Sequence, residues 1–144
     1  AKGLMDQYFE RFGAVKDYPD DIVEQARAKG FTETIMGRRR YLPALHSHRR
    51  QLRDMAERAA LNAPIQGSAA DIMKIAMLKV ADRLKDLHSP MLLQVHDEII
   101  VDVRPDEINE VKAIVTEEMG SAFELDVPLD VNVGTGRSWH AAAH

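Results

Sequence analysis

Two adjacent acidic residues, Asp97 and Glu98, stand between two apolar runs and are the clearest sign of chemistry in this sequence. The β-rich runs 91–95 and 99–103 flank the polar centre that begins at His96, a pattern that predicts strand, tight turn and strand. Neighbouring carboxylates repel each other unless water or a cation lies between them, and hard cations such as Mg²⁺ prefer carboxylate oxygens. Two such ions can activate a hydroxyl nucleophile and stabilise the departing oxygen in a displacement at phosphorus. The alternative is structural, because acidic residues are common in turns and the histidine can simply pack.

A second feature is a local excess of positive charge in a chain whose formal net charge is −4. Between positions 38 and 58 lie seven arginines and two acids, whereas the chain beyond position 97 is acidic. The arginines are Arg38, Arg39, Arg40, Arg49, Arg50, Arg53 and Arg58. A basic patch beside an acidic region suits a protein that holds a polyanion and a divalent metal together, although such arginines can also form a solvated surface.

The composition fits one domain or a piece of a larger one, with 144 residues of which 45% are hydrophobic. The absence of cysteine excludes disulfides and thiolate metal sites, and it agrees with a reducing cytosol. No apolar run approaches the roughly 20 residues that span a bilayer, and the first residues do not read as a signal peptide. Because the chain does not begin with methionine, we expect a truncated start.

Helices are predicted on either side of a first hairpin. Apolar spacing indicates a helix over 4–18 that ends by Pro19, and a second helix over 20–29. Three acids near this junction are interpreted as a helix boundary and cap rather than as metal ligands. They are Asp17, Asp20 and Asp21. The runs 31–35 and 41–42 flank a glycine-containing segment and predict the hairpin.

The longest helical pattern covers residues 52–87, with an apolar stripe at every fourth position from Ile72 onward. Pro64 removes a backbone donor and clashes one turn back, so we expect a kink or break there. Ser68 offers a fresh N-cap. The sequence therefore predicts two helical segments that meet at 62–67.

The last third of the chain predicts the strands and helix around the acidic tip. Residues 107–119 read as an amphipathic helix, and 127–133 as a last short strand. Together with the 91–103 hairpin these elements predict a mixed sheet covered by helices, hence an α+β fold.

Four segments resemble conserved parts of family A DNA polymerases, the bacterial DNA polymerase I group. The run Gln94-Val95-His96-Asp97-Glu98 is similar to the family's third polymerase motif, and residues 56–72 resemble its long palm helix. Residues 34–43 resemble the hairpin before that helix, and 125–129, with 133–134 and Trp139 after them, resemble the C-terminal end. Because the four follow in order over nearly the whole chain, the chain is identified as a member of this family from the C-terminal part of the polymerase domain.

The resemblance implies a catalytic role for the acidic tip. Asp97 is expected to be a catalytic carboxylate that ligates metal, with Glu98 beside it, near the primer 3′ hydroxyl, as a second metal ligand. His96 is expected to contact the primer terminus. The fold it implies is an antiparallel palm sheet with a catalytic hairpin, packed by a long kinked helix and flanking helices.

It also implies a DNA-binding face. On the palm helix, Arg58, Asn62 and Gln66 would face the template strand and the minor groove of the newest base pair. Their spacing agrees independently, since positions four apart share one helical face. Three arginines of the hairpin are expected to touch DNA phosphates, because arginine forks match phosphate oxygens. They are Arg38, Arg39 and Arg40.

The chain departs from the family in places. The segment 45–50 replaces an asparagine-containing one, and its His46 and His48 read as surface residues rather than a metal site. Trp139-His140 stands where the family often has an acid. The earlier palm motif with the other catalytic aspartate, the fingers helix that grips the triphosphate, the thumb and any nuclease domain are not in the sequence.

The expected function is template-directed addition of deoxynucleotides to a primer 3′ end, with release of pyrophosphate, in DNA replication and repair. Mg²⁺ is the expected cofactor, and primer-template DNA and deoxynucleoside triphosphates are the expected partners. Residues 1–30 are expected to complete the fingers helices and 31–144 to form the C-terminal part of the palm. The full-length protein is expected to be a monomer in the bacterial cytoplasm, associated with the nucleoid and without membrane contact.

The fragment alone is expected to be inactive, because part of the active site lies elsewhere. The alternative function is a non-catalytic nucleic-acid-binding domain on the same scaffold, and retention of the acids together with Arg58 and Gln66 argues against it. An unrelated metal-dependent nuclease should show further acids at ligand spacing, and none is convincing.

Overall fold

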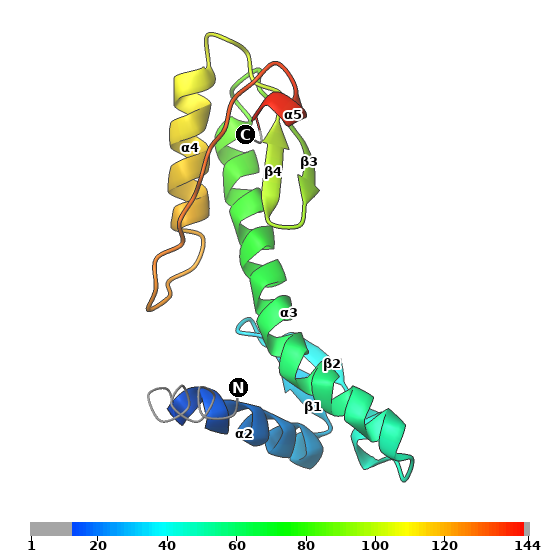
Figure 1. The fold of residues 1–144 in the computed structure, drawn as a ribbon. Coiled ribbons are helices and arrows are strands. Elements are labelled where there is room, and N and C mark those ends of the chain that lie inside the picture. The colour runs from blue at the N-terminus through cyan, green and yellow to red at the C-terminus, as the bar shows by residue number, and fades with distance from the viewer. Residues whose placement is uncertain (1–12, 143–144) are drawn as a thin grey trace, which may run out of the picture. The chain divides into compact units, whose positions relative to one another are not determined.

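The computed structural model describes residues 13–142, with side chains from Tyr18 onward (Figure 1). The chain divides into two compact units at the junction between Asp71 and Ile72, and each unit has its own buried core. The part of the predicted first helix that covers positions 4–12 lies outside the described residues.

The first unit begins with α2 (Gly13–Lys29), a single helix that contains Pro19. The predicted helix end at this proline, and the predicted cap just after it, are therefore wrong. A proline removes one hydrogen bond of the helix ladder, and burial of Ala26 beside half-buried Val23 against α3 holds the helix together. The helix ends at Gly30, whose amide donates to the Ala26 carbonyl at 2.8 Å.

The predicted first hairpin is confirmed. Strands β1 (Phe31–Glu33) and β2 (Arg39–Tyr41) pair antiparallel, with Phe31 opposite Tyr41. Gly37 in the connecting loop has a φ of 77°, a left-handed conformation that glycine adopts at little cost. A 3₁₀ helix, η1 (Pro43–His46), follows and buries Leu45 against the N-terminal part of α3.

Helix α3 runs without interruption from Arg50 to Leu84. The predicted division into two helical segments at 62–67 is therefore wrong, and Pro64 lies inside one helix of 35 residues. Proline and glycine cost a helix interior about 3 and about 1 kcal/mol relative to alanine, so the turn that holds Pro64 and Gly67 is intrinsically the weakest. Ala56 and Ala60 are buried in the core of the first unit just before this turn, and that packing offsets part of the cost.

The second unit contains the C-terminal part of α3, a second hairpin and two further helices. Strands β3 (Met91–Val95) and β4 (Glu98–Val101) pair antiparallel with an irregularity between Met91 and Leu93. Helix α4 (Ile108–Gly120) confirms the amphipathic helix predicted at 107–119. Figure 1 shows α4 and the hairpin beside this part of α3. The buried side chains that join them are Val80, Leu84, Val111 and Ile114, with Ile99 and Val101 packed against them.

The α+β class is confirmed, but the sheets differ from the expectation. The described residues form two separate two-stranded sheets rather than one mixed sheet. Residues 127–133 form no strand, and the side chain of Val127 is 66% exposed. A strand needs a neighbour for its backbone groups, and no other strand of the described part of the chain pairs with this segment. The described chain ends with the short helix α5 (Trp139–Ala142).

Candidate active site

The turn between β3 and β4 holds the acidic triplet as predicted. His96 and Asp97 form the turn, and Glu98 opens β4 opposite Val95. His96 has a φ of 52°, and the left-handed region costs a residue with a side chain about 1–2 kcal/mol. The side-chain amide of Gln94 donates from Nε2 to the His96 carbonyl and closes the turn. Backbone strain of this kind is concentrated at functional sites, so the tip is a candidate site on conformation as well as on composition.

The two carboxylates at this tip face solvent. Asp97 and Glu98 are both exposed, and neither makes a hydrogen bond or ion pair with another of the described residues. Within residues 13–142, no group of three or more His, Cys, Asp or Glu side chains is placed to hold a metal ion. The pair therefore fits a Mg²⁺ site in the type of its donors, and further ligands have to come from beyond the described residues.

The other end of the β3–β4 hairpin is fixed by a network around Ser89, whose side chain is fully buried. Its hydroxyl donates to the Glu107 carboxylate and accepts from the Arg104 amide at 3.1 Å. The hydroxyl, together with the His88 amide, holds the pKa of Glu107 below its ordinary value. The strands are thus anchored at their base and carry a free acidic tip.

The predicted DNA-binding residues of α3 lie on one continuous helix in the first unit. Arg58, Asn62 and Gln66 are all exposed, and the helix does not break at Pro64 between them. Successive positions four apart differ by about 40° around a helix, so the three side chains share a face. Arg58 also lines an open groove of about 670 Å³ between α2 and α3, together with Arg27 and Glu57 of opposite charge.

The three hairpin arginines differ in their surroundings. Arg38 donates from Nε to Asp71 Oδ1 at 2.9 Å and from Nη2 to the Gly67 carbonyl at 3.1 Å. Arg39 donates from Nε to Glu33 Oε1 at 2.7 Å, and this hydrogen bond to the carboxylate raises the pKa of Arg39. Arg40 is exposed and has no polar partner among the described residues. Arg40 is therefore the arginine of this group that has no internal ion pair within the described part of the chain.

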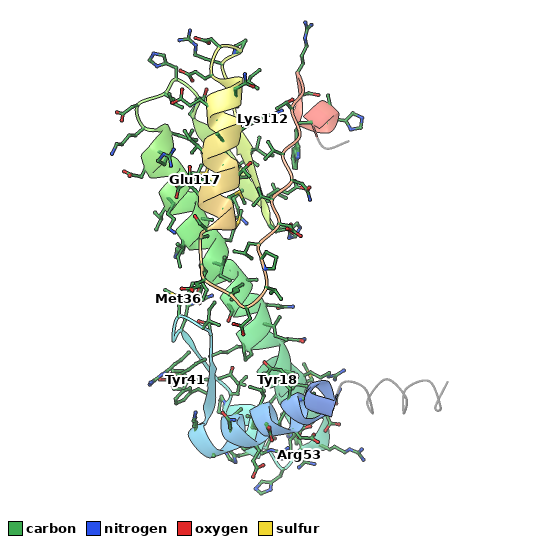
Figure 2. All side chains as sticks on the ribbon, turned by 90° about the vertical axis from the view of Figure 1, so that its left-hand side faces the viewer. Tyr18, Met36, Tyr41, Arg53, Lys112 and Glu117 are labelled. Carbon is green, nitrogen blue, oxygen red and sulfur yellow. The ribbon has the colours of Figure 1, made fainter. Side chains whose placement is uncertain are left out.

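Sequence reasoning missed the contact between the hairpin loop and α3. The Thr34 hydroxyl donates to the Asp71 carboxylate, and Ser68 Oγ accepts from the Ile35 amide at 3.0 Å. Ser68 was predicted as an N-cap, but it lies inside α3 and holds the loop instead. The available signal was Gly67 in a helix interior, which suggests a close approach of another segment. Met36 at the tip of this loop is exposed, and so is Tyr41 in β2 (Figure 2).

The two histidines of the segment 45–50, where the chain departs from the family pattern, lie on the surface. Nε2 of His46 lies 3.1 Å from the carbonyl oxygen of Arg27, so the ring is hydrogen-bonded to the last turn of α2. His48 is exposed. The prediction that these are surface residues agrees with this arrangement.

Comparison with known proteins gives the chain its family. The family described as "DNA polymerase family A" matches residues 1–141. DNA polymerase I of Mycobacterium leprae is 62% identical over 146 aligned residues, which cover 100% of this chain and 16% of that protein. The thermostable DNA polymerase I of Thermus filiformis is 49% identical over 96% of the chain and 17% of its own length.

A solved structure agrees with these sequence matches. The polymerase domain of Pol1 from M. smegmatis, in complex with DNA primer-template and dNTP, superposes with a TM-score of 0.95 at 60% identity. The match covers 99% of this chain and 26% of that one. The chain belongs to DNA polymerase family A. It is similar to the bacterial DNA polymerases I and spans about a sixth of the length of these relatives. No helix among residues 13–142 is long and apolar enough to cross a membrane.

Proposed function

We propose that this chain supplies part of the catalytic centre of a DNA-directed DNA polymerase, which adds deoxynucleotides to a primer 3′ end in replication and repair. The observation that carries the proposal is the pair of exposed, unpartnered carboxylates on a strained turn, in a chain that belongs to DNA polymerase family A. The complex of the M. smegmatis relative with primer-template and dNTP supports the choice of substrates.

The catalytic step is proposed to take place at the acidic tip of the second hairpin. Asp97 and Glu98 would hold a divalent metal, proposed to be Mg²⁺, with Asp97 as the principal ligand and Glu98 beside the primer terminus. When bound, the metal supplies charge stabilisation and activation of the attacking hydroxyl. His96, whose backbone is left-handed in the turn, would contact the primer end.

The exposed face of α3 is assigned to DNA. Arg58, Asn62 and Gln66 would lie along the template strand and the minor groove of the newest pair. Purine N3 and pyrimidine O2 are acceptors in every correct pair, so the amide of Gln66 can test the shape of a pair without reading its sequence. Among the hairpin arginines, Arg40 is the best candidate for a phosphate contact, since Arg38 and Arg39 have internal ion pairs.

We further propose that residues 1–30 complete the fingers and 31–144 form the C-terminal part of the palm. The chain alone would then be inactive, because its described residues supply two exposed carboxylates at the tip and no group of three metal ligands. The competing function is a non-catalytic nucleic-acid-binding domain.

The test uses a complete polymerase that carries this segment, for example M. leprae DNA polymerase I with its matching residues replaced. Asp97→Ala is expected to abolish primer extension and to leave primer-template affinity nearly unchanged, because the tip acts on the reacting atoms. The isolated chain is expected to give no extension product. Normal extension by the variant would contradict the proposal and favour a binding role for the tip. Turnover by the isolated chain would contradict the proposal that the chain alone is inactive.

A further inference from the structure

The loop of the first hairpin docks on the one turn of α3 that sequence makes weak. Pro64 and Gly67 lie within this turn, and Gln66 lies between them. Four polar contacts reach the turn from the loop: two from Arg38, one from Thr34 and one from the Ile35 amide. The carboxylate that receives two of them, Asp71, is only 11% exposed. The contacts therefore span the residues that directly follow Gln66.

The fit between loop and helix is close enough to exclude a side chain. A Cβ added at Gly67 would lie 2.5 Å from Cγ2 of Thr34, which is closer than carbon atoms can approach. The next atoms, from Arg38 and from Cβ of Thr34, would lie at 3.7 and 3.8 Å, which is ordinary contact distance. The methyl group of Thr34 is therefore the single obstacle to a side chain at position 67.

The loop is closed by hydrogen bonds among its own residues. The Thr34 amide donates to the Arg38 carbonyl at 3.0 Å, and the Gly37 amide donates to the Thr34 carbonyl at 2.9 Å. The Arg38 amide also donates to the hydroxyl of Thr34 at 3.2 Å. A loop closed by its own hydrogen bonds can transmit position to the helix rather than yield to it.

We propose that the loop Thr34–Arg38 braces the α3 turn that carries Gln66, and that Arg38 and Asp71 are positioning residues for discrimination between matched and mismatched primer ends. This inference rests on the proposed function and changes the role of Arg38 from a phosphate contact to an internal support. Discrimination by an amide depends on where that amide lies, and small misplacements reduce rates strongly.

The central experiment measures single-turnover extension of matched and mismatched primers by the complete polymerase defined above. Arg38→Gln and Asp71→Asn are each expected to lower the matched-to-mismatched rate ratio by roughly 3- to 30-fold, less than the ~100-fold that a 1 Å misplacement can cost. The matched control is Arg27→Gln, which breaks another arginine–carboxylate pair to α3, at Glu57, away from Gln66. This control is expected to leave the ratio unchanged.

A second readout separates a brace from a phosphate contact. Loss of a phosphate contact weakens DNA binding for every sequence and reduces the salt dependence of the affinity. The brace predicts that Arg38→Gln changes the rate ratio and leaves the salt dependence as it was. A uniform loss of affinity with a smaller salt dependence and an unchanged ratio would overturn the inference.

A third readout uses the close approach at Gly67. Gly67→Ala is expected to lower the ratio because the new methyl group displaces Thr34. Thr34→Ser removes the obstructing Cγ2 and keeps the hydroxyl that binds Asp71, so the double variant is expected to recover the ratio. If Gly67→Ala alone fails to fold, recovery of folding and ratio in the double variant supports the same geometry. A double variant that folds but keeps the low ratio would overturn it.

Gln66→Ala distinguishes failure of the brace from failure of the proposed function. If this variant lowers the ratio and Arg38→Gln and Asp71→Asn do not, the brace is wrong and the minor-groove role stands. If Gln66→Ala leaves the ratio unchanged, the minor-groove role is wrong and the brace falls with it. In the Gln66→Ala background Arg38→Gln is expected to have no further effect, and an additional decrease would show an independent action that contradicts the inference.

Discussion

The two hairpins of the chain have similar backbones and opposite tips. Each has two short antiparallel strands and a residue with positive φ in its connection, Gly37 in the first and His96 in the second. In the first hairpin the charged loop residue Arg38 is bound to Asp71 and to a helix carbonyl. In the second, Asp97 and Glu98 are exposed and have no partner among the described residues.

The difference shows how one local structure serves two purposes. A hairpin whose polar groups are satisfied inside the protein adds stability and fixes its neighbours. A hairpin that leaves two adjacent acids exposed and unpaired keeps both carboxylates available to a ligand of opposite charge. Glycine supports the left-handed position in the structural hairpin without strain, whereas the acidic one places a histidine there.

The largest expected effect is on catalysis at the second tip. In the complete polymerase, Asp97→Ala should lower the rate of nucleotide addition by at least about 10²–10³-fold, the range found for loss of one preorganised electrostatic group. Single-turnover incorporation measures this rate. Asp102→Ala is the control, since Asp102 is an exposed acid at the base of the same hairpin. Equal rate losses in Asp97→Ala and Asp102→Ala would contradict a specific catalytic role for the tip.

The next effect is on stability and should appear at the first tip. Asp71→Ala removes the acceptor for Thr34 and Arg38 and should lower the local free energy of unfolding by about 1.5–3 kcal/mol, the range for hydrogen bonds to charged groups. Hydrogen exchange of the Arg38 and Gly37 amides in the complete polymerase measures it. Asp97→Ala should leave the exchange of the hairpin amides near it unchanged. If Asp97→Ala reduced amide protection at the second hairpin more than Asp71→Ala does at the first, the proposed difference between the two hairpins would be wrong.

A smaller effect concerns the strained histidine. His96→Gly should be more stable than His96→Ala by about 1 kcal/mol, because alanine retains the left-handed penalty and glycine does not. Exchange of the Glu98 and Ile99 amides compares the two variants directly. Both should lose the proposed contact with the primer end. Equal protection in the two variants would mean that the turn relaxes out of the left-handed conformation when histidine is removed.

The smallest effect is the pH dependence of the base of the second hairpin. The folded pKa of Glu107 lies below its ordinary value of 4.5, first because Ser89 donates to it. A depressed folded pKa contributes stability above the unfolded pKa, and this stability is lost as pH falls through the folded pKa. Protection of the His88 and Arg104 amides, corrected for intrinsic exchange, should therefore fall below about pH 4.5. Glu107→Gln should flatten this dependence, and an unchanged slope would contradict the assignment.

Much of the fold could be predicted because its signals are local. Alternation and apolar runs located both hairpins, and helical spacing located the 107–119 helix. The errors at Pro19 and Pro64 have one cause, since burial of Ala26, Ala56 and Ala60 overrides the local penalty of proline. The false strand at 127–133 arose because β-forming residues make a strand only where a partner exists.

The candidate site residues likewise include some that the sequence could predict and some contacts that it could not. Asp97 and Glu98 were predictable because two acids between apolar runs are unusual in the sequence itself. The contact between Thr34 and Asp71 was not, because it joins residues 37 positions apart through one hydroxyl and one carboxylate of common types. The hydrogen bonds of Arg38 to Asp71 and Gly67 likewise form only because the hairpin packs on the helix. The spacing of residues in the sequence does not predict that packing.

The close approach at Gly67 also shapes how this polymerase segment can change over evolution. A Cβ at position 67 fits without displacing Thr34 only when Thr34 has lost its methyl group, so the two positions are expected to form an epistatic pair with a preferred order. Scanning one position at a time would score Gly67 as sensitive to substitution and Thr34 as permissive toward serine. A library that varies both positions together would recover combinations that such scanning discards.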